Sequence, residues 1–166
     1  MRIFPLIKEG SFQIEGAREK YMNTPIIEYR ERSRDFPSLV ELYQATGLGN
    51  NRTPDQVRTV FENSRHAVSA FYDGMLIGAG RSFGDEFDCA VICDIAVMPA
   101  FQGQGIGKQI LKRLVEKVKH HQRIVLYAKP GTEEFYRKLG FRKMETAFMT
   151  SYLLNMDNAR QIGFIE

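Results

Sequence analysis

Residues 95–108 read IAVMPAFQGQGIGK, so an apolar run, a proline and a group of glycines follow one another just before an expected helix. No Ser, Thr, Asp or Asn stands at the start of that helix to accept its first backbone N–H groups. Glycines let a ligand approach the backbone closely, and the helix dipole favours an anion at this end. The stretch predicts a pyrophosphate site. The alternative is a tight strand-to-helix turn that only needs flexible residues.

Two other phosphate-binding patterns fail on spacing. A P-loop requires Ser or Thr directly after its Gly-Lys pair, whereas Gly107-Lys108 is followed by Gln109. A dinucleotide-binding fold places its glycines after the first strand, with an acidic residue about 20 positions later. Here the glycines follow a late strand, and Gln122 and Arg123 stand where that acid is required. The sequence therefore favours neither a nucleoside triphosphatase nor a dinucleotide enzyme.

On both sides of this stretch the hydrophobic pattern changes between strands and helices. Strands are expected at about 26–30, 66–72, 75–83, 89–97 and 124–128, with one or two more within 141–154. Helices are expected at 36–46, 53–63, 105–119 and 132–139. This order predicts one α/β or α+β domain over residues 1–166, with helices on both faces of a mixed sheet. Residues 1–24 are weakly patterned and are expected to form an arm or an extra strand of unknown role.

The composition is ordinary for a soluble globular protein: 166 residues, 43% hydrophobic, 26% charged and a net charge of +3. No apolar run approaches the roughly 20 residues of a membrane span, and the first residues lack the apolar core of a signal peptide. We therefore expect a cytoplasmic protein without a membrane partner, in which Cys89 and Cys93 stay reduced. Their spacing fits no zinc site, so no metal is expected. The basic residues of 108–119 share one helix face, which is typical of a solvated surface and not of a nucleic-acid binder.

Two motifs about thirty residues apart resemble those of the GCN5-related N-acetyltransferases. The segment from Gln102 to Gly107 matches that family's Gln/Arg-x-x-Gly-x-Gly/Ala signature, and the segment from Phe135 to Phe141 matches its Phe-Tyr-x-x-Leu-Gly-Phe motif. The resemblance is specific over about 91–141 and only architectural over 25–83. It implies a central, mostly antiparallel mixed sheet flanked by helices, with acetyl-coenzyme A as cosubstrate.

The resemblance also implies which residues bind the cofactor. Backbone groups at the end of the strand pair with the pantetheine arm, and backbone N–H groups of the glycine-rich turn hold the pyrophosphate. The cofactor-binding residues implied in this way are Ile95, Ala96, Val97, Gln102, Gly103, Gln104, Gly105, Ile106, Gly107 and Lys108.

Tyr136 matches the family's general acid, which protonates the thiolate that leaves from coenzyme A. A phenol with a pKa of about 10 can donate to a sulfur of similar basicity. The alternative is a core aromatic whose hydroxyl is bonded elsewhere. The mechanism implied is direct transfer: a neutral amine attacks the thioester, and backbone donors near 95–97 stabilise the oxyanion.

A base is needed only to remove a proton from the ammonium group, directly or through water. Asp94 is the first candidate, because a carboxylate in an apolar strand is costly unless it has a partner or a role. The alternative is that Asp94 bonds a neighbouring strand or a turn. Glu28 and Glu86 are weaker candidates, and no histidine stands near Cys93 in the sequence to activate its thiol.

The acceptor is expected to be a small primary amine. Aromatic residues within 36–63, 72–83 and 144–152 suit an aromatic amine, whereas Asp85, Glu86 and Asp88 suit a polyamine. Two alternatives stay open: an acetyltransferase acting on protein lysines or N-termini, and a regulatory module that binds coenzyme A without catalysis. Homodimers are common in the resembled family, so a second copy is a candidate partner.

Overall fold

The structure, a computed structural model, describes residues 26–48, 52–149, 156–161, 163 and 165. The expected N-terminal arm, and positions 150–154 of the expected tail strands, lie outside these residues. The strands are β1 (Glu28–Glu31), β2 (His66–Tyr72), β3 (Met75–Gly84), β4 (Cys89–Val97) and β5 (Arg123–Leu126). The helices are α2 (Phe36–Thr46), α3 (Pro54–Glu62), the 3-10 helix η1 (Pro99–Phe101), α4 (Ile106–Val118), α5 (Glu133–Arg137) and α6 (Met156–Gln161).

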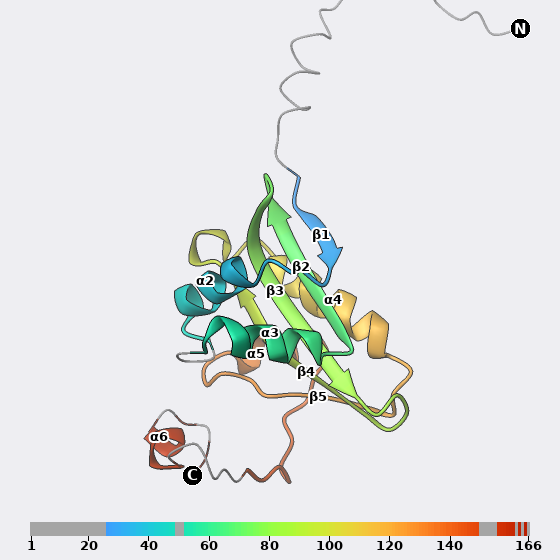
Figure 1. Cartoon of the computed structure of the whole chain (residues 1–166). Helices are drawn as coiled ribbons and strands as arrows, with labels where there is room; N and C mark the ends of the chain where they lie inside the picture. Colours follow the sequence, from blue (N-terminus) through green and yellow to red (C-terminus); the bar gives the residue numbers. More distant parts are fainter. Residues whose placement is uncertain (1–25, 49–51, 150–155, 162, 164, 166) are drawn as a thin grey trace, which may run out of the picture.

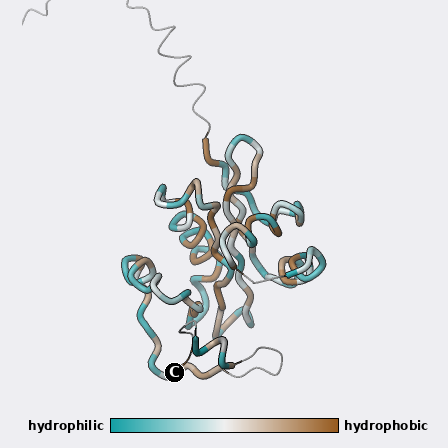
Figure 2. Tube along the Cα trace, turned by 90° about the vertical axis from the view of Figure 1, so that its left-hand side faces the viewer, coloured by the Kyte–Doolittle hydropathy of each residue, from teal (hydrophilic) through white to brown (hydrophobic). Residues whose placement is uncertain are grey.

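The strands form one sheet in the order β1-β2-β3-β4-β5. All neighbouring pairs are antiparallel except β4 and β5, which run parallel. Helices α2 and α3 cover one face and α4 covers the other (Figures 1 and 2). The expected mixed, mostly antiparallel sheet with helices on both faces is confirmed.

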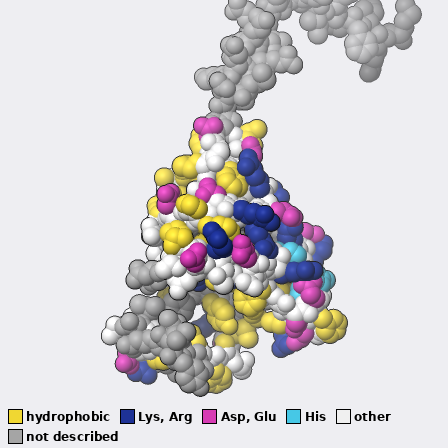
Figure 3. Space-filling view, in the orientation of Figure 1, with side chains coloured by type: hydrophobic (Ala, Val, Ile, Leu, Met, Phe, Trp, Pro, Cys, Tyr) yellow, Lys and Arg dark blue, Asp and Glu magenta, His cyan; other side chains and the backbone are white. Residues whose placement is uncertain are grey.

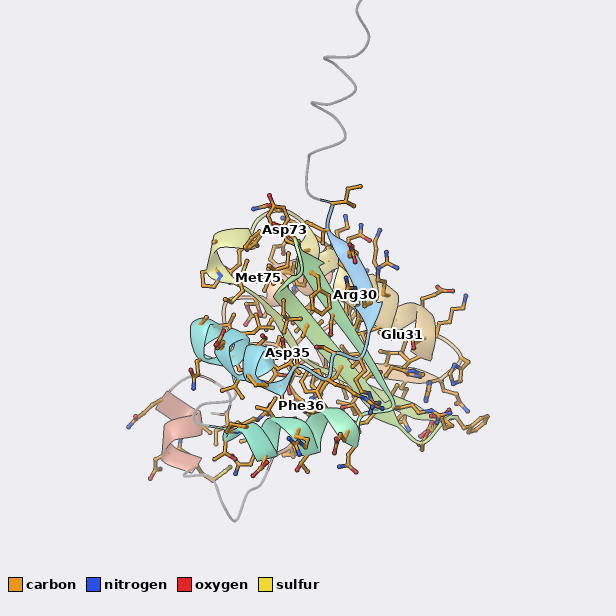
Figure 4. All side chains as sticks on the ribbon, turned by 45° about the horizontal axis from the view of Figure 1, so that its top comes forward. Arg30, Glu31, Asp35, Phe36, Asp73 and Met75 are labelled. Atoms are coloured by element: carbon orange, nitrogen blue, oxygen red, sulfur yellow. The ribbon has the colours of Figure 1, made fainter. Side chains whose placement is uncertain are left out.

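Local signals in the sequence explain where α2 and α3 begin. Asp35 accepts a hydrogen bond from Ser38 N at the start of α2, and Gly47, with φ of 63°, ends that helix. Figure 4 labels Asp35 and Phe36 at this start. At α3, Thr53 and Gln56 form the reciprocal capping box that their spacing suggests. These caps fix the helices that cover one face of the site.

Helix α4 packs closely on β3 because glycines face it. A Cβ on Gly80 would lie 2.7 Å from Ile110 Cγ2, and one on Gly78 would lie 3.0 Å from Ile110 Cδ1. The apolar stripe of α4 is fully buried there, namely Ile106, Ile110, Leu111, Leu114 and Val118. This contact fixes where the N-terminus of α4 stands relative to the sheet.

A β-bulge interrupts the pairing of β3 with β4. Ala79 pairs with Ala96 and Arg81 pairs with Cys93, so that Asp94 and Ile95 together oppose one residue of β3. Asp94 has a φ of 55°, in the left-handed region. The extra residue reverses the alternation of side chains, so Ile95 and Val97 join the core under α4.

The same strand separates from β5 near the bulge. The pairing of β4 with β5 ends at Ile92 and Leu126. Beyond that point, residues 93–97 have no partner strand on the β5 side within the described part of the chain. Backbone groups of β4 that point away from β3 are therefore open to a ligand.

The tail differs from its expectation. Residues 141–149, expected to begin the tail strands, form neither strand nor helix, and a short helix, α6, follows at 156–161. Residues 142–149 are exposed, and the pairs Arg142-Lys143 and Glu145-Thr146 interrupt the alternation that a half-buried strand needs. No helix in the described ranges is long and apolar enough to cross a membrane.

Candidate functional site

The glycine-rich turn has a backbone that other residues adopt only with strain. Gly103 and Gly105 have φ of 76° and 80°, and a Cβ on either would have no heavy atom within 4 Å. The space over both glycines is open. The glycines are therefore needed for backbone conformation and access, and not for tight packing.

The N-terminus of α4 presents unpaired donors. Gly105 occupies the N-cap position without a side-chain hydrogen bond. No described residue accepts a hydrogen bond from the backbone N–H groups of residues 103–108. Gln102 Nε2 donates to Val97 O over 2.9 Å and ties the turn to the end of β4. The residues present fit a pyrophosphate, since oriented N–H groups and a helix dipole favour an anion at this place.

Three segments meet beside this turn. A Cβ on Gly107 would lie 3.6 Å from Val97 Cγ2, 4.0 Å from Ile95 Cγ2 and 3.9 Å from Phe135 Cζ. The first turn of α4, the open end of β4 and helix α5 are thus in contact. A ligand held at the glycine turn and extended along β4 would pass beside α5.

Tyr136 lies on α5, half-buried between Phe135 and Phe141. The ring centroids are 5.0 and 6.2 Å away, both in edge-on arrangements. Burial raises the pKa of Tyr136 above its ordinary value of 10.0, so the phenol stays protonated at neutral pH. Its hydroxyl has no hydrogen-bond partner among the residues that the structure describes. The group is chemically able to donate a proton to a ligand.

Asp94 bonds the neighbouring strand, which is one of the two interpretations that the sequence left open. Its Oδ2 accepts from Arg81 Nε at 2.6 Å, from Arg52 Nη1 at 2.7 Å and from Tyr43 OH at 3.4 Å. Burial acts to raise the pKa of Asp94, but the hydrogen bonds and charges of the two arginines outweigh it and hold the pKa below its ordinary value. A carboxylate with a lowered pKa is a weaker proton acceptor.

The weaker candidates for a base lie away from the glycine turn, and the candidate nucleophile Cys93 is not activated. Glu28 pairs with Arg30 on the outer strand β1, an exposed position whose Arg30 is labelled in Figure 4. Burial raises the pKa of the Cys93 thiol to about 11, so it stays protonated. Glu86 pairs with Arg65 near the start of β4, at the opposite end of that strand from the glycine turn.

The acidic turn before β4 is occupied by local contacts. Asp85 Oδ1 accepts from the backbone N–H groups of Phe87, Asp88 and Cys89. Asp88 pairs with Arg123. Because the turn stands at the start of β4, its carboxylates do not line the site at the strand's end. Figure 3 shows basic and acidic side chains interspersed on one face of the molecule.

Sequence reasoning missed Arg52 and Arg81 as members of the site, and it placed Tyr43 among the aromatic residues of the acceptor region without foreseeing its contact with Asp94. A signal was present, since Arg81 and Asp94 are lone charged residues in two adjacent apolar strands. Charged residues in such positions are expected to pair with one another. The bulge that brings them together was not visible in the sequence.

Comparison with known proteins identifies a family whose sequence model matches this chain. The model of the Acetyltransferase (GNAT) family matches residues 29–141. An uncharacterized N-acetyltransferase ycf52-like of Prochlorococcus marinus is 33% identical over 116 residues, which cover 66% of this chain and 64% of that protein. Serotonin N-acetyltransferase 2, chloroplastic, of Oryza sativa is 32% identical over 113 residues, covering 64% of this chain and 56% of that protein.

Solved structures give the same fold. A probable acetyltransferase of meticillin-resistant Staphylococcus aureus aligns with a TM-score of 0.70 at 23% identity, covering 78% of this chain and all of that one. A GNAT family protein of Streptococcus pneumoniae aligns with a TM-score of 0.67 at 23% identity, covering 76% of this chain and 97% of that one. The match covers 64% of the length of each of the first two curated relatives, which is less than two thirds.

Proposed function

Because the chain belongs to the GNAT family of acetyltransferases, we propose that it transfers the acetyl group of acetyl-coenzyme A directly to a primary amine. One observation supports this most: the open glycine turn, the unpaired end of β4 and Tyr136's helix α5 meet around Gly107. The arrangement offers three things to a bound ligand: an anion site at the glycine turn, an extended backbone edge at the end of β4, and a proton donor on α5.

The backbone provides the cofactor site. N–H groups from Gly103 to Lys108 hold the pyrophosphate. The N–H of Gln102, which the sequence had included, donates to Pro99 O instead. Backbone groups of Ile95, Ala96 and Val97 pair with the pantetheine arm. Acetyl-coenzyme A, when bound, supplies the activated thioester. Donors on the open edge of β4 near Ile95 and Val97 are placed to stabilise the oxyanion that forms on attack.

Tyr136 acts as the general acid. Its raised pKa keeps the phenol protonated at neutral pH, so its proton is present for the thiolate when the carbon–sulfur bond of the thioester breaks. For the ammonium proton of the acceptor, we propose transfer to water instead of transfer to Asp94. The support is the double ion pair of Asp94, which lowers its pKa and occupies its Oδ2.

The acceptor is a small amine in this proposal. A polyamine loses its support, since Asp85 and Glu86 bond other groups at the far end of β4. Transfer to protein lysines or N-termini is the alternative. A histone acetyltransferase TAP1 of Glycine max is 40% identical over 68 residues, which cover 40% of this chain and 27% of that protein. A cytoplasmic location and a homodimer stay predictions.

The test measures thiol release from acetyl-coenzyme A with a panel of small amines, polyamines and lysine peptides, for wild type and Tyr136→Phe. We expect the mutation to lower kcat at least about tenfold, since a general acid typically contributes about 100- to 10,000-fold. Affinity for acetyl-coenzyme A, followed by calorimetry, should stay unchanged. Tyr29→Phe is the matched control, because Tyr29 lies on β1, at the edge of the sheet opposite β5.

The other outcomes are distinct. Equal kcat in both tyrosine variants would remove Tyr136 as the acid and keep the enzyme. Cofactor binding without release on any acceptor would support the regulatory module. An absence of acetyl-coenzyme A binding would contradict the proposed function altogether.

A further inference from the structure

Two arginines share a single carboxylate on the face of the sheet that carries α2 and α3. Arg81 and Arg52 both donate to Oδ2 of Asp94, and the Asp94 side chain is only 10% exposed. Tyr43, from α2, donates to the same oxygen. Because two guanidinium groups meet one carboxylate, one positive charge is left over.

No other group of the cluster balances that charge. Burial raises the pKa of Tyr43 far above its ordinary value, and the Cys93 thiol has its pKa raised to about 11, so both are neutral. Within the described ranges, no second carboxylate pairs with Arg52 or Arg81. A partly buried cation without a counter-ion is costly, so the cluster is best completed by an anion.

Arg52 is the arginine with free donors. Arg81 is 11% exposed and uses Nε on Asp94 and Nη1 on Ser64 Oγ. Arg52 is 28% exposed and, toward the residues that the structure describes, donates through Nη1 alone, while its guanidinium lies 5.6 Å from the centre of the Tyr43 ring. A guanidinium has five N–H donors in a planar fork that matches a carboxylate or phosphate. The remaining donors of Arg52 are available to such a group.

The cluster stands next to the segment where transfer is proposed. Asp94 directly precedes Ile95, so the carboxylate and the open edge of β4 are a few ångströms apart. On one side of the sheet, Ile95 and Val97 pack under α4. An acceptor must therefore approach this segment from the other side, where Arg52 lies.

We propose that the acceptor amine carries an anionic group, a carboxylate or a phosphate, and that Arg52 binds this group. The inference rests on the proposed function and names its substrate class. A cationic acceptor would meet an excess positive charge here, and the acidic turn at the start of β4 is too far away to offset it. An aromatic amine without an anionic group would leave that charge uncompensated.

The experiment compares kcat/KM within matched pairs of amines. Phenylalanine and 2-phenylethylamine differ by a carboxylate, and O-phosphoethanolamine and ethanolamine differ by a phosphate. In one pair or both, we expect at least a tenfold preference for the member that carries the carboxylate or phosphate. The pair that shows the preference identifies the anion. Spermidine and a neutral lysine peptide complete the panel.

Variants assign the preference to Arg52. Arg52→Gln should lower kcat/KM for the amine that carries the anionic group to that of its partner without the group, chiefly through KM. Arg52→Lys keeps the charge beside Asp94 but loses the planar fork, so it should retain part of the preference while folding normally. Arg58→Gln is the control, because Arg58 lies on the exposed face of α3 against the Phe36 ring, 5.1 Å away.

The outcomes of these experiments distinguish a failure of this inference from a failure of the proposed acetyltransferase function. Acetylation with no preference within either pair, or with spermidine or the lysine peptide as best acceptor, would overturn the inference and keep the transferase. A preference that survives Arg52→Gln would also overturn it. Acetyl-coenzyme A binding without acetylation of any amine would overturn both proposals.

Discussion

Arg81 donates from Nε to Oδ2 of Asp94 over 2.6 Å, and this ion pair spans the β-bulge between β3 and β4. Asp94 has a left-handed backbone there, which costs a residue with a side chain about 1–2 kcal/mol. The pair with Arg81 offsets that cost. The bulge in turn decides that Ile95 and Val97 face α4, so the ion pair stabilises the segment along which the cofactor is proposed to lie.

We expect Arg81→Met to destabilise the protein by about 2–4 kcal/mol, because a buried carboxylate then keeps only one of its two cationic partners. The free energy of unfolding in urea measures this. Arg65→Met is the matched control, since the side chains of its pair with Glu86 are 62% and 49% exposed and the pair should contribute little. Equal midpoints for the two variants would contradict a structural role for the Arg81–Asp94 pair.

The stability that Asp94 provides should be lost in acid. Its pKa in the folded protein lies below the ordinary value of 3.8, so the unfolded chain binds the proton more readily. The contribution is therefore complete above pH 3.8 and disappears as the pH falls through the lower, folded value. We expect the difference in unfolding free energy between wild type and Asp94→Asn to shrink as the pH falls below about 4. A difference that stays constant across this range would show that the charge of Asp94 contributes nothing.

The sequence predicts the parts of this molecule that depend on local signals. The glycine turn at 102–107, the Asp73-Gly74 hairpin and the capping box at Thr53 each need only a few adjacent residues, and each is present. Figure 4 places Asp73 and Met75 at the hairpin turn. Local signals of this kind were enough to predict that the glycine turn follows a buried strand.

The bulge and the arginine cluster could not be predicted in the same way. Counting alternate positions along 89–97 gives one continuous apolar strand, and the position of an extra residue depends on β3, which is distant in the chain. Arg52 joins Asp94 from 42 residues away. Long-range pairing of this kind has no local signature, so the role of Asp94 stayed open until the fold was known.

Gly105→Ala should weaken cofactor binding, whereas Gly47→Ala, which imposes similar backbone strain, should not. Gly105 and Gly47 both have positive φ, 80° and 63°, and a Cβ on either would contact nothing within 4 Å. Alanine at either position therefore imposes similar backbone strain, about 1 kcal/mol. Only at position 105 does the change also turn N–H groups away from the proposed pyrophosphate and narrow the approach to them. We expect the Kd for coenzyme A to rise at least tenfold in Gly105→Ala and to stay unchanged in Gly47→Ala.

Gly80→Ala should displace α4 and, with it, the glycine turn. The new Cβ would lie 2.7 Å from Ile110 Cγ2 and 3.0 Å from Leu114 Cδ1, so the helix must move outward. Overpacking of this kind costs about 1–3 kcal/mol, and we expect a weaker affinity for coenzyme A as well. Ile110→Ala removes the contacting branch and should accommodate the added methyl group. The double variant should therefore be more stable than the sum of the two single changes indicates. Additive losses in urea unfolding would show that Gly80 is not the residue that sets the distance between α4 and β3.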